Sequence, residues 1–338
     1  MGPVEPFTFV DGERLIRFGS GVLAEATDLL SARGFEGYAL LTTPRAFGSA
    51  GGLEGNAATV LEVDQGAVPE LASALRGAVG DLPIVALGGG RVIDVAKAIA
   101  GTGQARCAAI PTTLAGSSFT PFHRLPNDAP GARMVRPALV IADPDLMASA
   151  PLPLLAATAM NGLAHAFESL YTPRANPIAE AAALRAASGF AAGLADPSAP
   201  ERDSLALGAL LGGYAVGTTG FAIHHATCQT LVRILSTPHA LTNAVVLPHS
   251  VAFMADRAPR AVGRFADALG AGSDLAAAPG AVAALAAHAG PTTLSELGVQ
   301  ASWIEHVAKA VVEHPAVAGT PPSKPTPAEV RALLDAAF

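Results

Sequence analysis

Hydrophobic positions in the first 145 residues follow two alternating patterns. Short, mostly apolar runs predict buried strands, and stretches with apolar residues every three to four positions predict the helices between them. Strands that alternate with helices favour a parallel sheet with crossover helices. The predicted strands are 38–42, 59–63, 83–87, 107–110 and 138–141, and the predicted helices are 21–33, 68–79 and 92–100.

The pattern changes at Asp143-Pro144, after which no convincing strand pattern occurs. Ala- and Leu-rich helical patterns follow, and Pro and Gly residues separate them. We therefore expect an α/β domain over 1–145 and an all-helical domain over 146–338. The predicted helices of the second domain are 152–171, 178–194, 202–218, 221–235, 258–269, 277–289, 303–313 and 326–337.

Composition and charge exclude several classes of protein. The chain has 338 residues, of which 51% are hydrophobic and 14% charged, so it can build large cores and is not a disordered protein. The net charge is -7 and no Lys/Arg run occurs, which argues against a nucleic-acid surface. No uninterrupted apolar stretch reaches the roughly 18–20 residues of a membrane helix, so we expect no membrane association.

Cysteine usage and the N-terminus indicate the compartment. Cys107 and Cys228 are the two cysteines, both in apolar contexts, and two cysteines cannot form a disulfide framework. The first residues show no basic segment followed by an apolar run, which predicts no signal peptide. Pro6 stands where the myristoylation pattern needs Ser or Thr. We expect a reduced, cytoplasmic protein.

A glycine run follows the third predicted strand. The sequence LPIVALGGGRVIDVAKAIAG passes from this strand through Gly88, Gly89 and Gly90 into a helix. Glycines at such a turn let backbone N–H groups approach a phosphate, and the helix N-terminus adds partial positive charge. Asp94 and Lys97 share one face of that helix. We predict a phosphate-binding loop; because the spaced G-x-G-x-x-G fingerprint is absent, a structural turn is the alternative.

A second polar loop follows the next predicted strand. The sequence IPTTLAGSSFT places Thr112, Thr113, Ser117 and Ser118 after the strand end, and these side chains can bind a phosphate, ribose or amide. Alone this is an ordinary Ser/Thr/Gly loop. Two such loops at the carboxyl ends of neighbouring strands favour a nucleotide-binding crevice.

Histidines cluster in two segments of the second domain. In MNGLAHAFESLY, Asn161 and His165 are four residues apart and lie on one helix face, which Glu168 continues. In AIHHATCQTLVRILSTPH, His225 and His239 are 14 residues apart, and we expect them at the start of one helix and at the turn after it. Such clustering indicates a site. Five of the nine histidines lie in or just after these segments: His165, His224, His225, His239 and His249.

This cluster has the pattern of a metal site without its carboxylate. Three imidazoles can bind a borderline divalent ion. The fourth position is Asn161, whose neutral amide is a weak ligand. Because the missing carboxylate removes a full charge from the ligand set, we expect a site without metal.

Together these segments resemble the iron-containing alcohol dehydrogenase superfamily over nearly the whole chain. The closer resemblance is to its maleylacetate reductases, which also have Asn in the first ligand position. GGGRVIDVAKAIAG resembles the family's pyrophosphate loop, and IPTTLAGSSFT its P-T-T-x-x-G-S loop near the nicotinamide. MNGLAHAFESLYTPRANP resembles the N-x-x-A-H-x-x-E segment of the reductases, and IHHATCQTLVRILSTPHALTNAVVLPH their H-H-x-x-C and P-H-A segments.

The resemblance implies the dehydroquinate synthase-like fold, with an N-terminal nucleotide-binding α/β domain and a helical C-terminal domain. It also implies an active site in the cleft between them, a homodimer, and NADH or NADPH as cofactor. The metal-ligand positions of the family fall on Asn161, His165, His225 and His239. In the metal-free reductases these positions would bind and polarise a small-molecule substrate instead.

The chain also departs from the reductases it resembles. Gln229 stands where they usually have His, and the C-terminal loop lacks their Asn-Pro-Arg. The segment 121–135 is shortened. These departures concern the substrate more than the fold. The other replaced positions are Ser118 for Glu, Val232 and Arg233 for a Gly pair, and Leu241 and Asn243 for Glu and His.

The leading hypothesis is a metal-independent, NAD(P)H-dependent reductase of a C=C or C=O bond in a small oxo acid. His165, His225 and His239 would orient the substrate and stabilise oxyanion charge. At least one of them would deliver the proton, since imidazole titrates near neutral pH, and the sequence does not decide which. The alternatives are a metal-dependent alcohol dehydrogenase with Asn161 as a ligand, and a diverged non-redox enzyme such as a lyase or cyclase.

The choice between NADH and NADPH depends on the residues after the first predicted strand. An acidic residue there would select NAD through the ribose hydroxyl, but this chain has Thr43. Arg45 nearby can accommodate a 2′-phosphate or can be an ordinary solvated charge, so both cofactors stay open.

Overall fold

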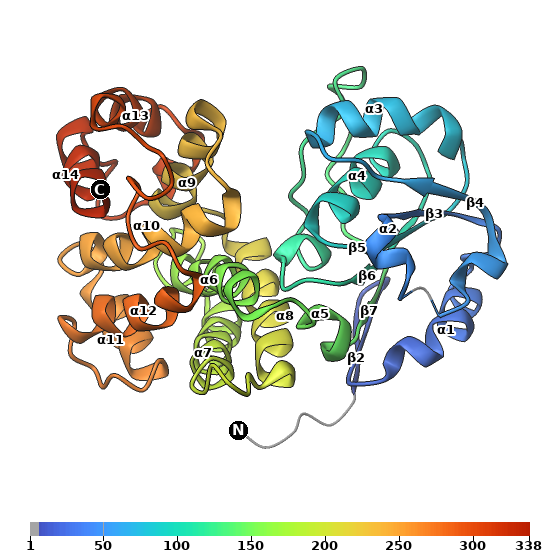
Figure 1. The fold of residues 1–338 in the computed structure, drawn as a ribbon, viewed down its shortest axis with the longest axis horizontal. Coiled ribbons are helices and arrows are strands. Elements are labelled where there is room, and N and C mark those ends of the chain that lie inside the picture. Colours follow the sequence, from blue (N-terminus) through green and yellow to red (C-terminus); the bar gives the residue numbers. More distant parts are fainter. Residues whose placement is uncertain (1–6, 50) are drawn as a thin grey trace. The chain divides into compact units, whose positions relative to one another are not determined.

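The computed structural model describes residues 7–49 and 51–338. They form two compact units, of which the first ends at Ser149 and the second spans Ala150–Phe338. The first unit is an α/β sheet with its helices, and the described residues of the second contain helices and no strand (Figure 1). The predicted fold class is therefore confirmed.

Seven strands form the sheet of the first unit in the order β1-β2-β7-β6-β5-β3-β4. All neighbouring pairs are parallel except β1 with β2, which form an antiparallel hairpin. The five predicted strands are confirmed to within two residues at each end, whereas the sequence analysis missed the hairpin. The strands are β1 Phe7–Asp11, β2 Arg14–Phe18, β3 Tyr38–Thr42, β4 Ala57–Glu62, β5 Ile84–Gly88, β6 Cys107–Pro111 and β7 Leu139–Ala142.

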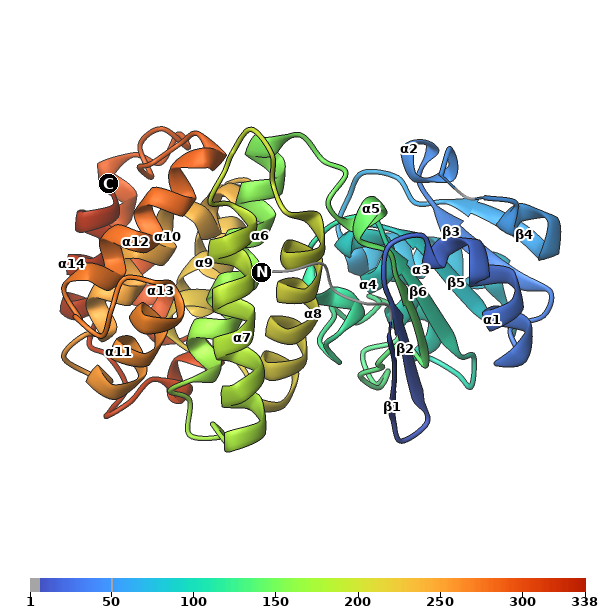
Figure 2. The same ribbon diagram turned by 90° about the horizontal axis from the view of Figure 1, so that it is seen from below.

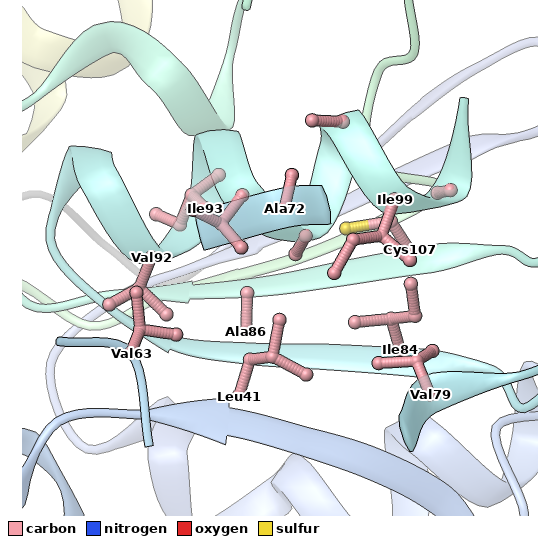
Figure 3. Packing of buried hydrophobic residues seen from close by; sticks show 14 of the residues in the cluster. Leu41, Val63, Ala72, Val79, Ile84, Ala86, Val92, Ile93, Ile99 and Cys107 are labelled. Atoms are coloured by element: carbon pink, nitrogen blue, oxygen red, sulfur yellow. The ribbon is translucent and has the colours of Figure 1, made fainter. Parts of the chain in front are cut away.

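Successive residues of β5 enter different cores because side chains of a strand alternate between the two faces of the sheet. Ile84 and Ala86 pack with α3 (Val68–Val79) and α4 (Gly90–Ala100), as Figure 3 shows. Val85 and Leu87 join the opposite core, which includes side chains of η1 (Val22–Glu25) and α1 (Ala26–Ala32). Burial on both faces explains why this strand is apolar throughout.

Three helices run side by side in the second unit (Figure 2): α6 (Leu152–Ser169), α7 (Pro177–Gly193) and α8 (Arg202–Thr219). Small residues let their backbones approach, since a Cβ at position 212 would lie 2.8 Å from the carbonyl oxygen of Gly162. The remaining helices of this unit are α9 Ile223–Leu235, α10 His239–Met254, α11 Pro259–Ala268, α12 Ala277–Ala286, α13 Ile304–Val312 and α14 Pro327–Ala337.

Helix α10 was not predicted, and the placement of His239 in a turn was wrong. Pro248 lies inside this helix and interrupts the helical signal, because proline removes one backbone donor and clashes with the preceding turn. The helix forms nevertheless, since it buries Val246, Leu247 and Val251 completely. His239 is its first residue.

Among the described helices, none by itself has the length and apolar character needed to cross a membrane. Helices α8 and α9 meet that test as a pair bent by 98°, by length and composition only.

A methyl group at position 162 is expected to destabilise the helical unit. The added Cβ would overlap the ring of Phe190, which is fully buried in α7, so Gly162→Ala should lower the free energy of unfolding by about 2 kcal/mol. Urea denaturation measures this difference. Gly280→Ala is the matched control in α12: nothing lies within 4 Å of its Cβ, and it should gain up to about 1 kcal/mol of helix propensity. Equal stabilities of the two variants would contradict the packing argument.

Candidate active site

Glu168 of α6 and His225 of α9 form a buried pair. The Nδ1 atom of His225 lies 2.7 Å from Oε2 of Glu168, and the backbone N–H of His225 donates to Oε1 of the same carboxylate at 3.2 Å. The His225 side chain is 3% exposed and that of Glu168 is 0% exposed. Because the first N–H groups of a helix have no partner within it, the Glu168 carboxylate also stabilises the N-terminus of α9.

This pair decides which nitrogen of His225 carries its proton. A carboxylate only accepts hydrogen bonds, so Nδ1–H donates to Glu168 and Nε2 keeps a lone pair. Nε2 is buried and has no hydrogen-bond partner among the described residues. Burial lowers the pKa of His225 to about 3. Burial also raises the pKa of Glu168, an effect that His224 and the backbone N–H groups of α9 oppose.

Asn161 and His165 lie one turn apart on α6, and the His165 ring stacks on the ring of His225 with centroids 4.8 Å apart. Oδ1 of Asn161 and Nδ1 of His165 are buried and have no hydrogen-bond partner among the described residues. Buried polar atoms almost always have partners. Unpartnered atoms on three of the four predicted positions therefore indicate a place where a bound polar group belongs.

Burial, reinforced by the neighbouring histidines, holds the pKa of His165 well below its ordinary value. His165 and His225 are consequently neutral at physiological pH. The sequence left open which histidine delivers the proton, because it carries no information on how deeply each ring is buried. The low pKa values argue against His165 and His225 in that role.

His239, the first residue of α10, has an exposed side chain. It belongs to the same cluster, since its charged form lowers the pKa values of both His165 and His225. The amide Nδ2 of Asn243 donates to the backbone carbonyl of His239 at 2.8 Å, and Oδ1 of Asn243 lies 2.9 Å from Nε2 of His224. His224 and Asn243, both fully buried, thus anchor the first turn of α10 to α9.

The predicted cofactor residues lie at the carboxyl ends of β3, β5 and β6, which are neighbouring parallel strands. Gly88 ends β5 and Gly90 begins α4. The loops after β5 and β6 touch, because a Cβ on Gly89 would lie 3.2 Å from Thr113 and one on Gly90 would lie 3.2 Å from Ser117. Only glycine leaves these backbones open for close approach.

Two further residues of this set, Thr112 and Thr43, have structural partners. Thr112 donates its backbone N–H to the carbonyl of Gly88 at 3.0 Å, joining the two loops. Thr43 follows β3 and caps the short helix α2 (Pro44–Phe47) by accepting from the N–H of Ala46 at 3.3 Å.

Lys97 and Arg14 hold the loop after β6 in place. Lys97, 0% exposed, donates from Nζ to Asp94 at 3.1 Å and to the carbonyls of Ser117 and Phe122 at 2.9 and 2.6 Å. Burial lowers its pKa, and Asp94 opposes that shift. Arg14 donates to the Ser118 carbonyl at 2.7 Å. Arg14 was not predicted, because it lies in the missed hairpin.

Two patterns of one protein family match the chain. The pattern described as "Iron-containing alcohol dehydrogenase" matches residues 17–151, and "Fe-containing alcohol dehydrogenase family, C-terminal" matches residues 155–338. The chain belongs to the iron-containing alcohol dehydrogenase family. Within this family it is maleylacetate reductase-like, as relatives and solved structures show. The resemblance that the motifs indicated is confirmed.

Relatives with about one third identical residues align with most of the chain. Maleylacetate reductase 1 of Rhodococcus opacus is 36% identical over 75% of this chain and 72% of its own length. Maleylacetate reductase of Burkholderia cepacia is 33% identical over 95% and 94%. The crystal structure of maleylacetate reductase from Agrobacterium tumefaciens has 30% identity and a TM-score of 0.83 over 99% of both chains.

Despite the family name, the residues at the ligand positions fit an iron ion poorly. Asn161 offers a neutral oxygen where a carboxylate would supply charge, so the set contains no anionic ligand. In the described part of the chain, no three His, Cys, Asp or Glu side chains are arranged to hold a metal ion. The one buried carboxylate of the cluster, Glu168, is engaged with His225.

Proposed function

We propose that the chain is a metal-independent, NAD(P)H-dependent reductase that acts on a C=C or C=O bond of a small oxo acid, as a maleylacetate reductase-like enzyme. The observation that carries this proposal is the His225 ring, held by Glu168 with an unpartnered Nε2 beside the unpartnered atoms of Asn161 and His165. Oδ1 of Asn161 and Nε2 of His225 are acceptors, so they suit a hydroxyl, a protonated carboxyl or a water molecule, and the three atoms bring no negative charge to a cation.

In this proposal the loops after β5 and β6 hold the cofactor, and Thr43 follows the neighbouring strand. When bound, the reduced nicotinamide supplies a hydride, which carries both electrons to the substrate carbon. One proton completes the balance. NADH and NADPH are both retained, because Thr43 leaves the ribose position neutral and Arg45 is exposed.

The chain's own residues position the substrate and supply the proton. Nε2 of His225 accepts a hydrogen bond and thereby positions a protonated oxygen or a water molecule, while Asn161 and His165 orient the substrate. The balancing proton enters at His239, whose exposed side chain exchanges protons with solvent, whereas the rings of His165 and His225 are buried and neutral. Following the resemblance, we propose that the enzyme acts as a cytoplasmic homodimer.

Stopped-flow absorbance of the reduced nicotinamide tests the proposal with maleylacetate as substrate. We expect oxidation of NADH or NADPH that depends on maleylacetate and survives chelator treatment. Absence of cofactor binding at millimolar concentration would overturn the redox assignment. Turnover without any cofactor would favour the lyase or cyclase alternative. Stoichiometric iron or zinc, with activity lost to chelators, would establish the metal-dependent alcohol dehydrogenase.

Restoring a carboxylate at position 161 is expected to create metal affinity. Asn161→Asp adds an anionic oxygen one turn before His165, so the affinity for Zn²⁺ should rise at least about tenfold over the native chain. Isothermal titration with Zn²⁺ measures the change. Asn176→Asp, at the cap of α7 outside the cluster, is the matched control and should leave Zn²⁺ binding unchanged. Equal affinities of the native chain and Asn161→Asp would contradict the role given to the missing charge.

A further inference from the structure

Gln229 lies next to the histidine cluster and is bound by a residue from the C-terminal part of the chain. It stands four residues after His225 on α9, so the two side chains are neighbours on adjacent turns. His314, which precedes the 3₁₀ helix Pro315–Gly319, reaches Gln229 across 85 residues of sequence: its Nε2 lies 3.2 Å from Oε1 of Gln229. His314 also contributes to the low pKa of His225, which places this pair beside the site.

The hydrogen bonds of His314 determine how the Gln229 amide is turned. The backbone N–H of Ala316 donates to Nδ1 of His314 at 3.2 Å, so Nδ1 carries no proton. The ring proton is therefore on Nε2, which must donate. Only the oxygen of the amide can accept that bond, and the amide NH₂ consequently faces away from His314. The orientation follows from the chemistry of the bonds and does not depend on distinguishing oxygen from nitrogen.

Among the described residues, none accepts a hydrogen bond from the NH₂ group of Gln229. The bond to His314 is the one hydrogen bond that the Gln229 side chain makes within the described ranges. The side chain is half-buried, and the neighbouring ring of His225 is held between Glu168 and the stacked ring of Phe221, with centroids 4.4 Å apart. An oriented, unused donor beside a site of unpartnered atoms is available to a ligand.

We propose that Gln229 is a specificity-determining residue whose Nε2–H donates to an oxygen of the substrate, and that His314 is the positioning residue that aims it. This rests on the proposed function and names the group recognised: an acceptor oxygen, carbonyl or carboxylate, of the oxo acid, about 3 Å from Nε2. An amide N–H cannot accept, so a substrate with an ammonium group at this point is rejected. The reductases that the chain resembles usually have His here, and Gln229 provides a donor that does not titrate.

Steady-state kinetics with maleylacetate and reduced nicotinamide test the proposal. Gln229→Leu removes the donor at nearly constant size and should raise KM about tenfold with kcat within about threefold, which corresponds to one neutral hydrogen bond. Gln229→Glu replaces the donor by an anionic acceptor and should raise KM more. Gln300→Leu, an exposed glutamine of the same unit, is the matched control with unchanged KM.

A double-mutant cycle separates positioning by His314 from a general structural role. His314→Leu should raise KM several-fold in the native background and have no further effect in the Gln229→Leu background. An equal effect in both backgrounds, or an unchanged KM in Gln229→Leu, would overturn the proposal. If Gln229→Leu fails to fold, Gln229→Asn, which withdraws the amide, must raise KM by itself. If the native enzyme oxidises NAD(P)H with maleylacetate and all variants have the native KM, only this inference is overturned. If the native enzyme lacks that activity, the proposed function is overturned as well.

Discussion

Replacing Glu168 by glutamine is expected to lower kcat by at least about a hundredfold while the protein stays folded. The glutamine amide would occupy the same space, but its NH₂ group would donate to Nδ1 of His225. The proton of the ring would then move to Nε2, the atom that now offers a lone pair to the site. A wrong tautomer of this kind is strongly damaging in catalytic histidines held by a carboxylate.

Kinetics and nitrogen NMR check this result together. The ¹⁵N shifts of His225 should show the proton on Nδ1 in the native chain and on Nε2 in Glu168→Gln. The matched control is Glu305→Gln, which removes an exposed carboxylate that pairs with Lys309 and Arg331. This control should keep native kcat. A kcat of Glu168→Gln within threefold of native, with the tautomer reversed, would show that the Nε2 lone pair has no part in the reaction.

Acid is expected to destabilise the helical unit well before the carboxylates titrate. Burial lowers the pKa of His224 to about 3, from an unfolded value near 6.5. A lowered pKa means that stability is present above pH 6.5 and is lost as the pH falls toward the folded value, because only the unfolded chain takes up the proton. At pH 5, His224 alone should cost about 2 kcal/mol. His165 and His225 act in the same direction, whereas the raised pKa of Glu168 acts in the opposite one.

Urea midpoints at pH 7.5, 6 and 5 measure this dependence. His224→Gln should flatten the profile by about one proton in this range, since glutamine does not titrate. His306→Gln, at an exposed position of α13, is the matched control and should leave the slope unchanged. A native protein with equal stability at pH 7.5 and 5 would show that the three buried imidazoles take up protons without unfolding.

The sequence was enough to predict the helices and strands that are specified by local patterns of residues. Helix 68–79 and strand 38–42 were predicted with their observed bounds, because each is specified by the spacing of its own apolar residues and ends at turn-forming neighbours. The prediction of an element failed where its local sequence signal conflicts with burial in the tertiary structure. Pro248 argues against a helix by its own chemistry, yet the buried face of α10 outweighs the one lost hydrogen bond.

For the candidate site too, the sequence predicted some features and the tertiary structure decided the others. Residue type and spacing were enough to single out Asn161, His165, His225 and His239, and the family resemblance joined them to a glycine-rich cofactor loop. Only the tertiary structure decided the protonation of His165 and His225. Glu168, 57 residues away in sequence, determines which nitrogen of His225 carries the proton. His314, 85 residues away in sequence, determines the orientation of the Gln229 amide. Spacing along a chain determines which side chains can share a helix face, whereas burial and hydrogen bonds between distant helices determine their charge and orientation.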